Sequence, residues 1–344
     1  MSQESIIKRK TEHLDICSDD SPAFRHKSTG FENYDFRHFA LTEVDLTRID
    51  LSRKFFGFKS SFPFLISCMT GGTDEANNIN LKLAETAASL NIPLGLGSLR
   101  YAIGTNGFDA QLSAIREKAG SVPVLGNLGA AQILGSDRVE TVNSLIKKSG
   151  ADVFVIHLNP LQELLQNGGE YNFRGLLKSI KDLVSEAKIP IIVKEVGSGI
   201  DGVTAKKLLK AGVSGIDTAG AGGTSWAGVE ILRNSKSGNS DFWDWGIPTS
   251  ICISETVSLK KDYDFTLIAS GGINDPFTAA KALALGADFV ASARIILHAL
   301  NKNGSQGVVK LIREWFETVK RIMFLTGAQT LKEFDKKILI QTQK

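Results

Sequence analysis

The sequence predicts a closed (β/α)8 TIM barrel preceded by an N-terminal arm. Three observations predict this α/β fold: eight short apolar runs, amphipathic segments between them, and polar or glycine-rich residues after each run. The runs are apolar along their length and often β-branched, as expected for strands of a parallel sheet that is buried on both faces. They lie at 63–67, 92–96, 122–125, 152–156, 189–193, 215–218, 266–269 and 288–291. Eight such units on about 260 residues match the size of this barrel.

Five segments between the runs predict helices, because their apolar residues recur at three- and four-residue spacing. They lie at 77–90, 139–148, 173–187, 203–210 and 277–285. Gly150, Gly212 and Gly286 each follow a predicted helix, where a left-handed cap is needed before the next strand. An open, doubly wound sheet uses the same local units. Its GxGxxG fingerprint is absent after the first run, which favours the closed barrel.

Two regions fall outside the repeating pattern. Residues 1–61 are polar, and we expect them to form an arm and cap, followed by a single catalytic barrel domain at 62–344. Residues 235–248 place Trp243 and Trp245 among Gly, Ser and Asp. Two interpretations fit this segment: a mobile lid, or a surface loop whose aromatic side chains pack on a neighbour.

The composition narrows the possible partners and location. A net charge of +3 on 344 residues is too small to indicate binding to nucleic acid or to an anionic membrane surface. Cys17, Cys68 and Cys252 form no CxxC pair, which argues against a disulfide or metal framework and suits a reducing compartment. The N-terminus is too polar for a signal peptide, and no apolar run approaches the roughly 18 residues of a membrane helix. We therefore expect a cytoplasmic protein.

The predicted strands deliver polar side chains to one rim. In this architecture, binding and catalytic residues gather at the C-terminal ends of the strands. Here those ends carry Thr70, Ser98, Asn127, His157 and Lys194. Lys194 directly follows Ile-Ile-Val, and a buried lysine is costly unless an anion or an acceptor meets it. The alternative is a rim lysine paired with the carboxylate of Glu195.

The ends of the seventh and eighth runs resemble a phosphate cradle. Gly271 and Gly272 can expose backbone N–H groups, and the helix that begins near Asp275 would add its positive end. Such a site after strands seven and eight is common in these barrels, although a simple tight turn is the alternative. A phosphate grip beside Lys194 and Asn127 fits flavin mononucleotide (FMN), whose phosphate needs the cradle and whose ring edge needs hydrogen-bond donors.

A second anion site is suggested by the basic arm. Arg9 and Lys10, with Arg100 of the barrel, could neutralise a phosphate, although a solvated charge run is the alternative. Glu163 lies on the same loop as His157, and a carboxylate beside phosphate-binding groups suggests Mg²⁺ held between protein and diphosphate. His157 could instead be a core histidine with satisfied hydrogen bonds.

Eight motifs resemble the type 2 isopentenyl-diphosphate δ-isomerases, in order and over nearly the whole chain. They are RKTEH at 9–13, MTGG at 69–72, GSLR at 97–100, GNLGAAQ at 126–132, HLNPLQE at 157–163, VKEVG at 193–197, GGTSW at 222–226 and SGGI at 270–273. HLNPLQE together with RKTEH is the most specific combination. The chain departs from the family at Leu99, where relatives often have Gln, which puts one side-chain contact in doubt.

The resemblance implies a role for each matching position. FMN would contact Cys68, Met69, Thr70, Gly71, Ser98, Asn127, Lys194, Thr224, Gly271, Gly272, Ala293 and Arg294. The substrate diphosphate would contact Arg9, Lys10, Ser98, Arg100, His157, Asn159 and Gln162, and Glu163 would bind Mg²⁺. Gln162, His157 and Glu230 would be the catalytic residues, with Gln162 and Glu230 nearest the reacting carbons. Because Gln is a poor acid or base, the reduced flavin would be the main acid–base group.

The resemblance also implies the reaction and its partners. The enzyme would interconvert isopentenyl and dimethylallyl diphosphate, in isoprenoid biosynthesis, by a 1,3-allylic proton shift. It would use FMN in the reduced form, with NAD(P)H as the reductant, and assemble as a homotetramer or homo-octamer. These properties come from the family and not from composition or spacing.

Three rival functions fit the sequence less well. An FMN α-hydroxy-acid oxidase needs a His base and an Arg clamp after the sixth strand, and residues 218–230 contain neither. A purine-nucleotide dehydrogenase or reductase needs a nucleophilic Cys in a mid-barrel loop, and Cys252 has no glycine-rich loop around it. A phosphate-binding barrel without turnover would leave the 9–13 and 157–163 motifs unexplained.

Overall fold

The barrel closes as the sequence predicts. The computed structural model describes residues 3–234 and 240–342. Its eight parallel strands are β4 (Phe64–Ile66), β5 (Leu94–Gly95), β6 (Val124–Gly129), β7 (Val153–His157), β8 (Ile191–Lys194), β9 (Gly215–Asp217), β10 (Thr266–Ala269) and β11 (Phe289–Ser292). Each strand pairs with the next along the chain, and β11 pairs with β4 to close the ring. The predicted fold class is therefore confirmed, and each predicted run overlaps one strand.

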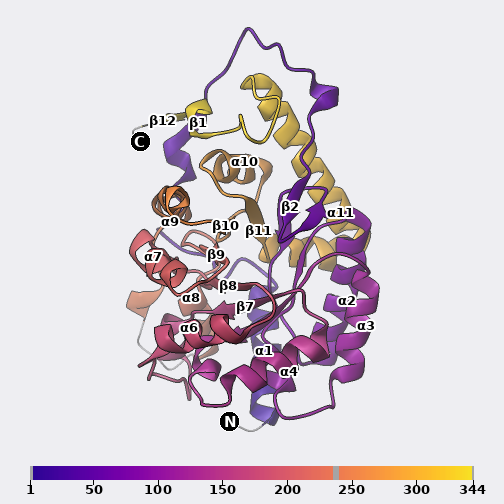
Figure 1. The fold of residues 1–344 in the computed structure, drawn as a ribbon, viewed down its shortest axis with the longest axis vertical. Coiled ribbons are helices and arrows are strands. Elements are labelled where there is room, and N and C mark those ends of the chain that lie inside the picture. Colours follow the sequence, from indigo (N-terminus) through magenta and orange to yellow (C-terminus); the bar gives the residue numbers. More distant parts are fainter. Residues whose placement is uncertain (1–2, 235–239, 343–344) are drawn as a thin grey trace.

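Helices surround this ring, with α2, α3 and α11 on one side and α7 and α9 on the opposite side (Figure 1). The helices are α1 (Gln3–Cys17), α2 (Asp74–Leu90), α3 (Asp109–Ala119), α4 (Arg138–Ser149), α5 (Pro160–Leu165), α6 (Leu176–Glu186), α7 (Gly202–Lys210), α8 (Trp226–Arg233), α9 (Thr249–Val257), α10 (Pro276–Ala284) and α11 (Arg294–Leu325). The five predicted helices correspond to α2, α4, α6, α7 and α10. Gly304 has non-helical backbone angles inside α11 and interrupts its apolar pattern, which helps to explain why the longest helix was not predicted.

Side chains fill the inside of the barrel at the N-terminal end of its strands. Phe55, Val155, Ile192 and Phe289 are buried inside the ring in a cluster separate from the larger core between strands and helices. Phe55 belongs to a hairpin of β2 (Arg53–Phe55) and β3 (Phe58–Ser60), and its ring packs edge-on against that of Phe289. Because this plug occupies the N-terminal end, the space for a ligand lies at the C-terminal end of the strands.

The segment before the barrel contacts it in several places. Helix α1 packs on α8, and Phe24 N donates to the Gly223 carbonyl in the loop after β9. Further on, β1 (Tyr34–Phe36) pairs antiparallel with β12 (Leu339–Gln341), close to the C-terminus (Figure 1). The segment before the barrel therefore contacts both the C-terminal strand β12 and the mouth of the barrel.

One of the two tryptophans in the segment 235–248 packs on a neighbour, as expected for a surface loop with packed aromatic side chains. Residues 235–239 of this segment lie outside the described residues. Trp243 is buried, its Nε1 donates to the Ala23 carbonyl at 2.8 Å, and the Arg25 guanidinium lies 3.6 Å from its ring centroid. Trp245 remains 60% exposed. In the parts of the chain described here, no helix is long and apolar enough to cross a membrane.

Candidate active site

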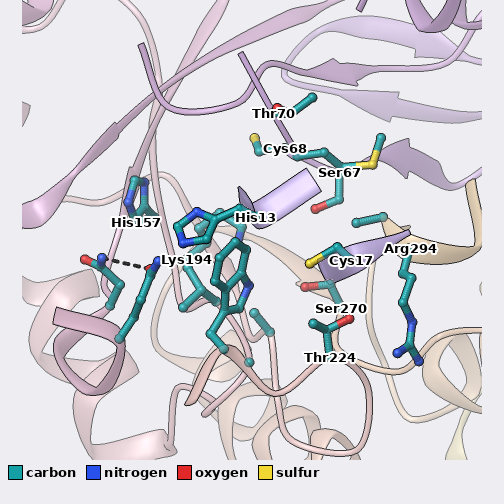
Figure 2. A pocket seen from close by; sticks show the side chains of 18 of the residues that line it. His13, Cys17, Ser67, Cys68, Thr70, His157, Lys194, Thr224, Ser270 and Arg294 are labelled. Atoms are coloured by element: carbon teal, nitrogen blue, oxygen red, sulfur yellow. Dashed lines mark hydrogen bonds between the residues drawn. The ribbon is translucent and has the colours of Figure 1, made fainter. Parts of the chain in front are cut away.

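One cavity of about 250 Å³ lies at the C-terminal ends of the strands, beneath α1. Eighteen of the predicted site residues line it: Arg9, Lys10, Cys68, Met69, Thr70, Ser98, Arg100, Asn127, His157, Asn159, Gln162, Glu163, Lys194, Thr224, Gly271, Gly272, Ala293 and Arg294. Figure 2 shows His157 and Arg294 on opposite sides of this pocket, with His13 and Lys194 between them. The barrel thus brings residues from all eight strand ends and from the arm to one place.

Three other predicted or flagged positions lie behind the cavity wall. A Cβ on Gly71 would lie 3.0 Å from Cε1 of Tyr101, so this glycine packs against the tyrosine ring and does not face the cavity. Glu230 is fully buried in α8. Leu99 is also fully buried, so its side chain does not reach a ligand in the cavity.

Glycines allow the loops after β9 and β10 to touch. Gly271 and Gly272 have φ of +94° and +73°, a conformation that favours glycine. A Cβ on Gly223 would lie 2.4 Å from the Gly272 nitrogen, and one on Gly272 would lie 2.4 Å from Cγ2 of Thr29. No side chain larger than hydrogen fits at Gly223 or Gly272. The backbone of both loops therefore forms part of the cavity wall.

The positive helix end at this cradle comes from α11, which corrects the expectation from sequence. At the start of α10, the Asp275 carboxylate already accepts hydrogen bonds from the backbone N–H groups of Phe277 and Thr278. By contrast, α11 begins at Arg294 and its N-cap residue, Ala293, makes no side-chain cap. The open end of α11 therefore supplies the N–H groups and dipole that favour an anion.

Arg294 adds a guanidinium with unused hydrogen-bonding capacity. Its Nη1 is buried without a hydrogen-bond partner and lies 3.5 Å from a carboxylate oxygen of the largely exposed Asp20. A buried donor without a partner is costly, and a bidentate anion such as phosphate would satisfy it. The glycine loops, the α11 terminus and Arg294 together fit the phosphate group of FMN.

Lys194 lies at the base of the cavity and is 7% exposed. Its Nζ donates to the backbone carbonyl of Glu195 at 2.5 Å. The Glu195 carboxylate instead accepts backbone N–H groups of the following loop, among them those of Val196 at 2.6 Å and Gly197 at 2.7 Å. The alternative of a lysine paired with the Glu195 carboxylate is therefore wrong. The remaining ammonium protons of Lys194 can serve a ligand.

Two groups near Lys194, His157 and Cys68, are uncharged at neutral pH. Burial, followed by the charges of Lys194 and Lys10, lowers the pKa of His157 to about 3, so its ring is neutral at physiological pH. The His157 Nδ1 lies 2.8 Å from Oδ1 of Asn127, an arrangement in which the neutral ring donates to the amide. Burial raises the pKa of the Cys68 thiol to about 12, so this thiol is neither a nucleophile nor a charge.

Three cations converge where α1 crosses the cavity. Lys10 Nζ donates to the Ser98 carbonyl at 3.0 Å and lies 4.7 Å from the Tyr101 ring centroid. Burial, then the charges of Arg9 and Arg100, lowers the pKa of Lys10 to about 7. Burial and Arg100 likewise lower the pKa of Arg9. An anion bound here would relieve this mutual repulsion, which fits a diphosphate.

A hydrogen-bonded network behind the cavity joins the arm to the barrel. Glu230 Oε1 lies 2.9 Å from Nε2 of His13 and accepts from Nε2 of Gln162 at 3.2 Å, and its Oε2 accepts from Nε of Arg233 at 2.8 Å. Burial raises the pKa of Glu230, but the hydrogen bond from His13 and the charges of His13 and Arg233 outweigh it and leave that pKa below its ordinary value. Glu230 is thus an ionised carboxylate that holds Gln162 and α1 together.

Glu163 is prepared to bind a cation. Its carboxylate is buried and accepts from Nδ2 of Asn159 at 3.2 Å, Nε2 of Gln166 at 3.2 Å and the Glu170 N–H at 2.9 Å. Oδ1 of Asn159 is buried without a partner. The described residues contain no group of three His, Cys, Asp or Glu that could hold a metal alone. This donor set fits Mg²⁺ that takes its other ligands from a diphosphate and water.

Some residues at the site were not predicted. They include Cys17, Ser67, Gln132, Gln166, Trp226 and Ser270 at the cavity and Arg233 behind it. A usable signal existed for one group, because Trp226, Glu230 and Arg233 recur at helical spacing and share a face of α8. His13 was noted only as part of the basic arm; the structure places its ring edge-on to Trp226 at 5.1 Å.

The chain matches known proteins over nearly its full length. A family model described as FMN-dependent dehydrogenase matches residues 2–103 and 165–341. An isopentenyl-diphosphate delta-isomerase of Chlorobium limicola is 40% identical, over 97% of this chain and 96% of its own. One of Stutzerimonas stutzeri is 39% identical over 99% of both chains. This chain belongs to the isopentenyl-diphosphate delta-isomerase family. The family, the enzyme class and the flavin-dependent isomerase function expected from the sequence are thereby confirmed.

Solved structures similar to this chain support the fold. A putative lactate oxidase of Pediococcus acidilactici superimposes with a TM-score of 0.72 at 16% identity, covering 99% of this chain and 95% of its own. A flavocytochrome b2 variant gives 0.71 at 19% identity, covering 98% and 85%. At such identities the likeness concerns the barrel, and the chemistry has to be argued from the site.

Proposed function

We propose that this chain interconverts isopentenyl and dimethylallyl diphosphate by a 1,3-allylic proton shift, with FMN in the reduced form and Mg²⁺. One observation carries the proposal: a single cavity has two separate anion-binding ends. One end combines the glycine loops with Arg294, and the other combines Arg9, Lys10 and Arg100. A flavin phosphate and a substrate diphosphate would occupy these two ends, which places the flavin ring and the alkene in the space between them.

The residues that would hold each group follow from the contacts. FMN would lie along the loops after β9, β10 and β11, with Arg294 at its phosphate and Lys194 at its ring. Mg²⁺ would bind between Glu163, Asn159 and the diphosphate. When bound, reduced FMN supplies an electron-rich ring that stabilises developing positive charge and a ring nitrogen that can exchange a proton.

The protein's own contribution is to orient the substrate and exclude water. The arm cations would fix the diphosphate, and the neutral His157 would hydrogen-bond to it without adding charge. Gln162 lines the cavity and is held by Glu230, so its amide would be set against the reacting carbons. Glu230 has no free path to the substrate, because it is fully buried behind Gln162 and His13. We therefore assign Glu230 a role in positioning Gln162. The catalytic effect expected for Glu230 would act through the Gln162 amide.

The hydroxy-acid oxidase reading of the same barrel lacks its residues. That chemistry needs a histidine base and an arginine carboxylate clamp, and residues 218–230 carry neither. Arg233, further along α8, is bound to Glu230 through two nitrogens and lies 3.4 Å from Glu12. No guanidinium on α8 is therefore available for a carboxylate substrate.

The proposal extends to the assembly and the cell. The N-terminal residues 1–61 would act as arm and cap, and 62–344 as the catalytic domain. NAD(P)H would reduce the flavin, and the enzyme would work in the cytoplasm as a homotetramer or homo-octamer. These proposals rest on the family and on the sequence expectations above.

The test begins with purified chain reconstituted with FMN. After anaerobic reduction and addition of Mg²⁺, we expect interconversion of the two C5 diphosphates. Lys194→Ala should weaken flavin binding, whereas Gln162→Ala should lower turnover and leave FMN affinity intact. Oxygen consumption with a 2-hydroxy acid, without isomerisation, would overturn the proposal in favour of the oxidase.

A further inference from the structure

Two buried carboxylates lie next to Lys194, and only one of them is fully engaged by backbone groups. Oε2 of Glu195 accepts the N–H groups of four successive residues, from Val196 at 2.6 Å to Gly199 at 3.2 Å. The second carboxylate belongs to Asp217, which is 2% exposed and was not singled out from the sequence.

Asp217 points to the same side of the barrel wall as Lys194. The two residues are paired in register on the parallel strands β8 and β9, and paired residues of neighbouring strands extend from the same face of the sheet. Asp217 Oδ1 accepts a hydrogen bond from Oγ of Ser270 at 2.5 Å, and Ser270 lines the cavity. The carboxylate therefore lies just beneath the cavity floor.

Asp217 also fixes the shape of that floor. The backbone N–H of Ala219 acts to lower the pKa of Asp217, and Ala219 lines the cavity with φ of +38°, which is unusual for a residue other than glycine. Strained backbone of this kind persists where the surroundings hold it, and it concentrates at binding sites. The same side chain thus touches the loop after β9 and the start of the loop after β10.

The charges around this carboxylate are few. Burial raises the pKa of Asp217 above its ordinary value, and the charge of Lys194, the hydrogen bond from Ser270 and the Ala219 N–H offset only part of that rise. The Cys68 thiol, on which the charge of Asp217 acts, is uncharged at neutral pH, and Glu195 is bound to its own loop. Lys194 is the cation that acts on Asp217 here.

We propose that Asp217 is a positioning residue that balances the charge of Lys194 and thereby sets how strongly the site favours reduced over oxidised FMN. This inference rests on the proposed function, since it requires FMN at Lys194. Removing the carboxylate leaves the ammonium charge uncompensated beside the flavin ring. An uncompensated positive charge favours the electron-rich reduced flavin, so the midpoint potential should rise.

The experiment measures the midpoint potential of FMN bound to the holoenzyme of Asp217→Asn. We expect at least a tenfold gain in the preference for reduced over oxidised FMN, which is a rise of about 30 mV for a two-electron couple. Ser270→Ala is the matched control, because it removes the hydrogen bond to Asp217 and keeps both charges. It should give less than half of that rise. If Asp217→Asn does not fold, Asp217→Ser removes the same charge and is read in the same way.

Three results would overturn the inference. They are an unchanged potential in the neutral variants, a fall in that potential, or an equal rise in Ser270→Ala, which would point to loop shape and not to charge. If the wild-type protein binds no FMN, that result would instead contradict the proposed function itself. Wild-type protein that binds FMN and isomerises, combined with an unchanged variant potential, would refute the role of Asp217 alone.

Discussion

The network around Glu230 allows a quantitative test of how the arm is held to the barrel. Glu230→Ala would leave the side chains of His13, Gln162 and Arg233 without their shared acceptor. Removing one partner of a buried ion pair costs at most about 3–5 kcal/mol here, because Arg233 also lies 3.4 Å from the carboxylate of Glu12. For a chain of 344 residues the corresponding fall in the unfolding midpoint is about 4–7 °C. Thermal unfolding at neutral pH measures it.

The same variant should release α1 and lower turnover. Because the His13 contact joins residues 217 positions apart, its loss should speed cleavage by trypsin within the arm, at Arg9 or Lys10. Turnover should fall while FMN affinity changes little. Glu85→Ala is the matched control, since its ion pair with Lys118 is about half exposed and such pairs contribute about 0–1 kcal/mol. A Glu230→Ala protein as stable as the Glu85→Ala control, with an uncleaved arm, would refute this reasoning.

The stability contribution of Glu230 also has a defined pH dependence. Its pKa in the folded state lies below the ordinary value of 4.5. The stabilisation is therefore present above pH 4.5 and is lost as the pH falls through the folded-state pKa. The difference in unfolding midpoint between wild type and Glu230→Ala should accordingly shrink in acid. A difference that grows in acid would contradict the ionised state assigned to Glu230.

Three further predictions concern the cavity wall. Arg294→Ala should weaken FMN binding about 10- to 150-fold in a fluorescence titration, since a hydrogen bond to a charged group contributes about 1.5–3 kcal/mol; equal affinity would exclude a phosphate contact. Gly272→Ala should lose FMN affinity because its Cβ meets Thr29, whereas Gly104→Ala, also at positive φ but in open space, should keep it; similar losses in both would contradict the cradle. The His157 ring should show no NMR titration between pH 5 and 8, and a midpoint near 6.5 would contradict its neutral state.

The barrel could be predicted because its strands have no solvent-facing side. Runs such as Ile191–Lys194 are apolar on both faces until the lysine, so the pattern marks both the strand and the point where it meets the cavity. Sixteen of the eighteen predicted residues at the cavity lie at or after the C-terminal ends of barrel strands, where functional residues of this fold gather, and the other two, Arg9 and Lys10, lie in the arm. The two-residue strand Leu94–Gly95 was overestimated in length, because the apolar residues around it are buried for other reasons.

The features of the site that the sequence did not predict depend on contacts between residues far apart in the chain. The expected helix dipole at Asp275 was wrong because the aspartate caps its own helix, a choice that local sequence leaves open. The link between His13 and Glu230 joins the first helix to α8, and no local pattern reports it. Asp217 escaped notice for a similar reason, since its importance comes from register with Lys194 on the neighbouring strand.

The most direct test of the central claim is a count of turnovers for each flavin reduced. Enzyme reconstituted with FMN would be reduced once, anaerobically and with a stoichiometric reductant, and then given Mg²⁺ and excess isopentenyl diphosphate. The account predicts many equivalents of dimethylallyl diphosphate, with no further reductant consumed and with the flavin still reduced at the end. Product limited to one equivalent of the reductant, or equal activity of the oxidised enzyme, would contradict it.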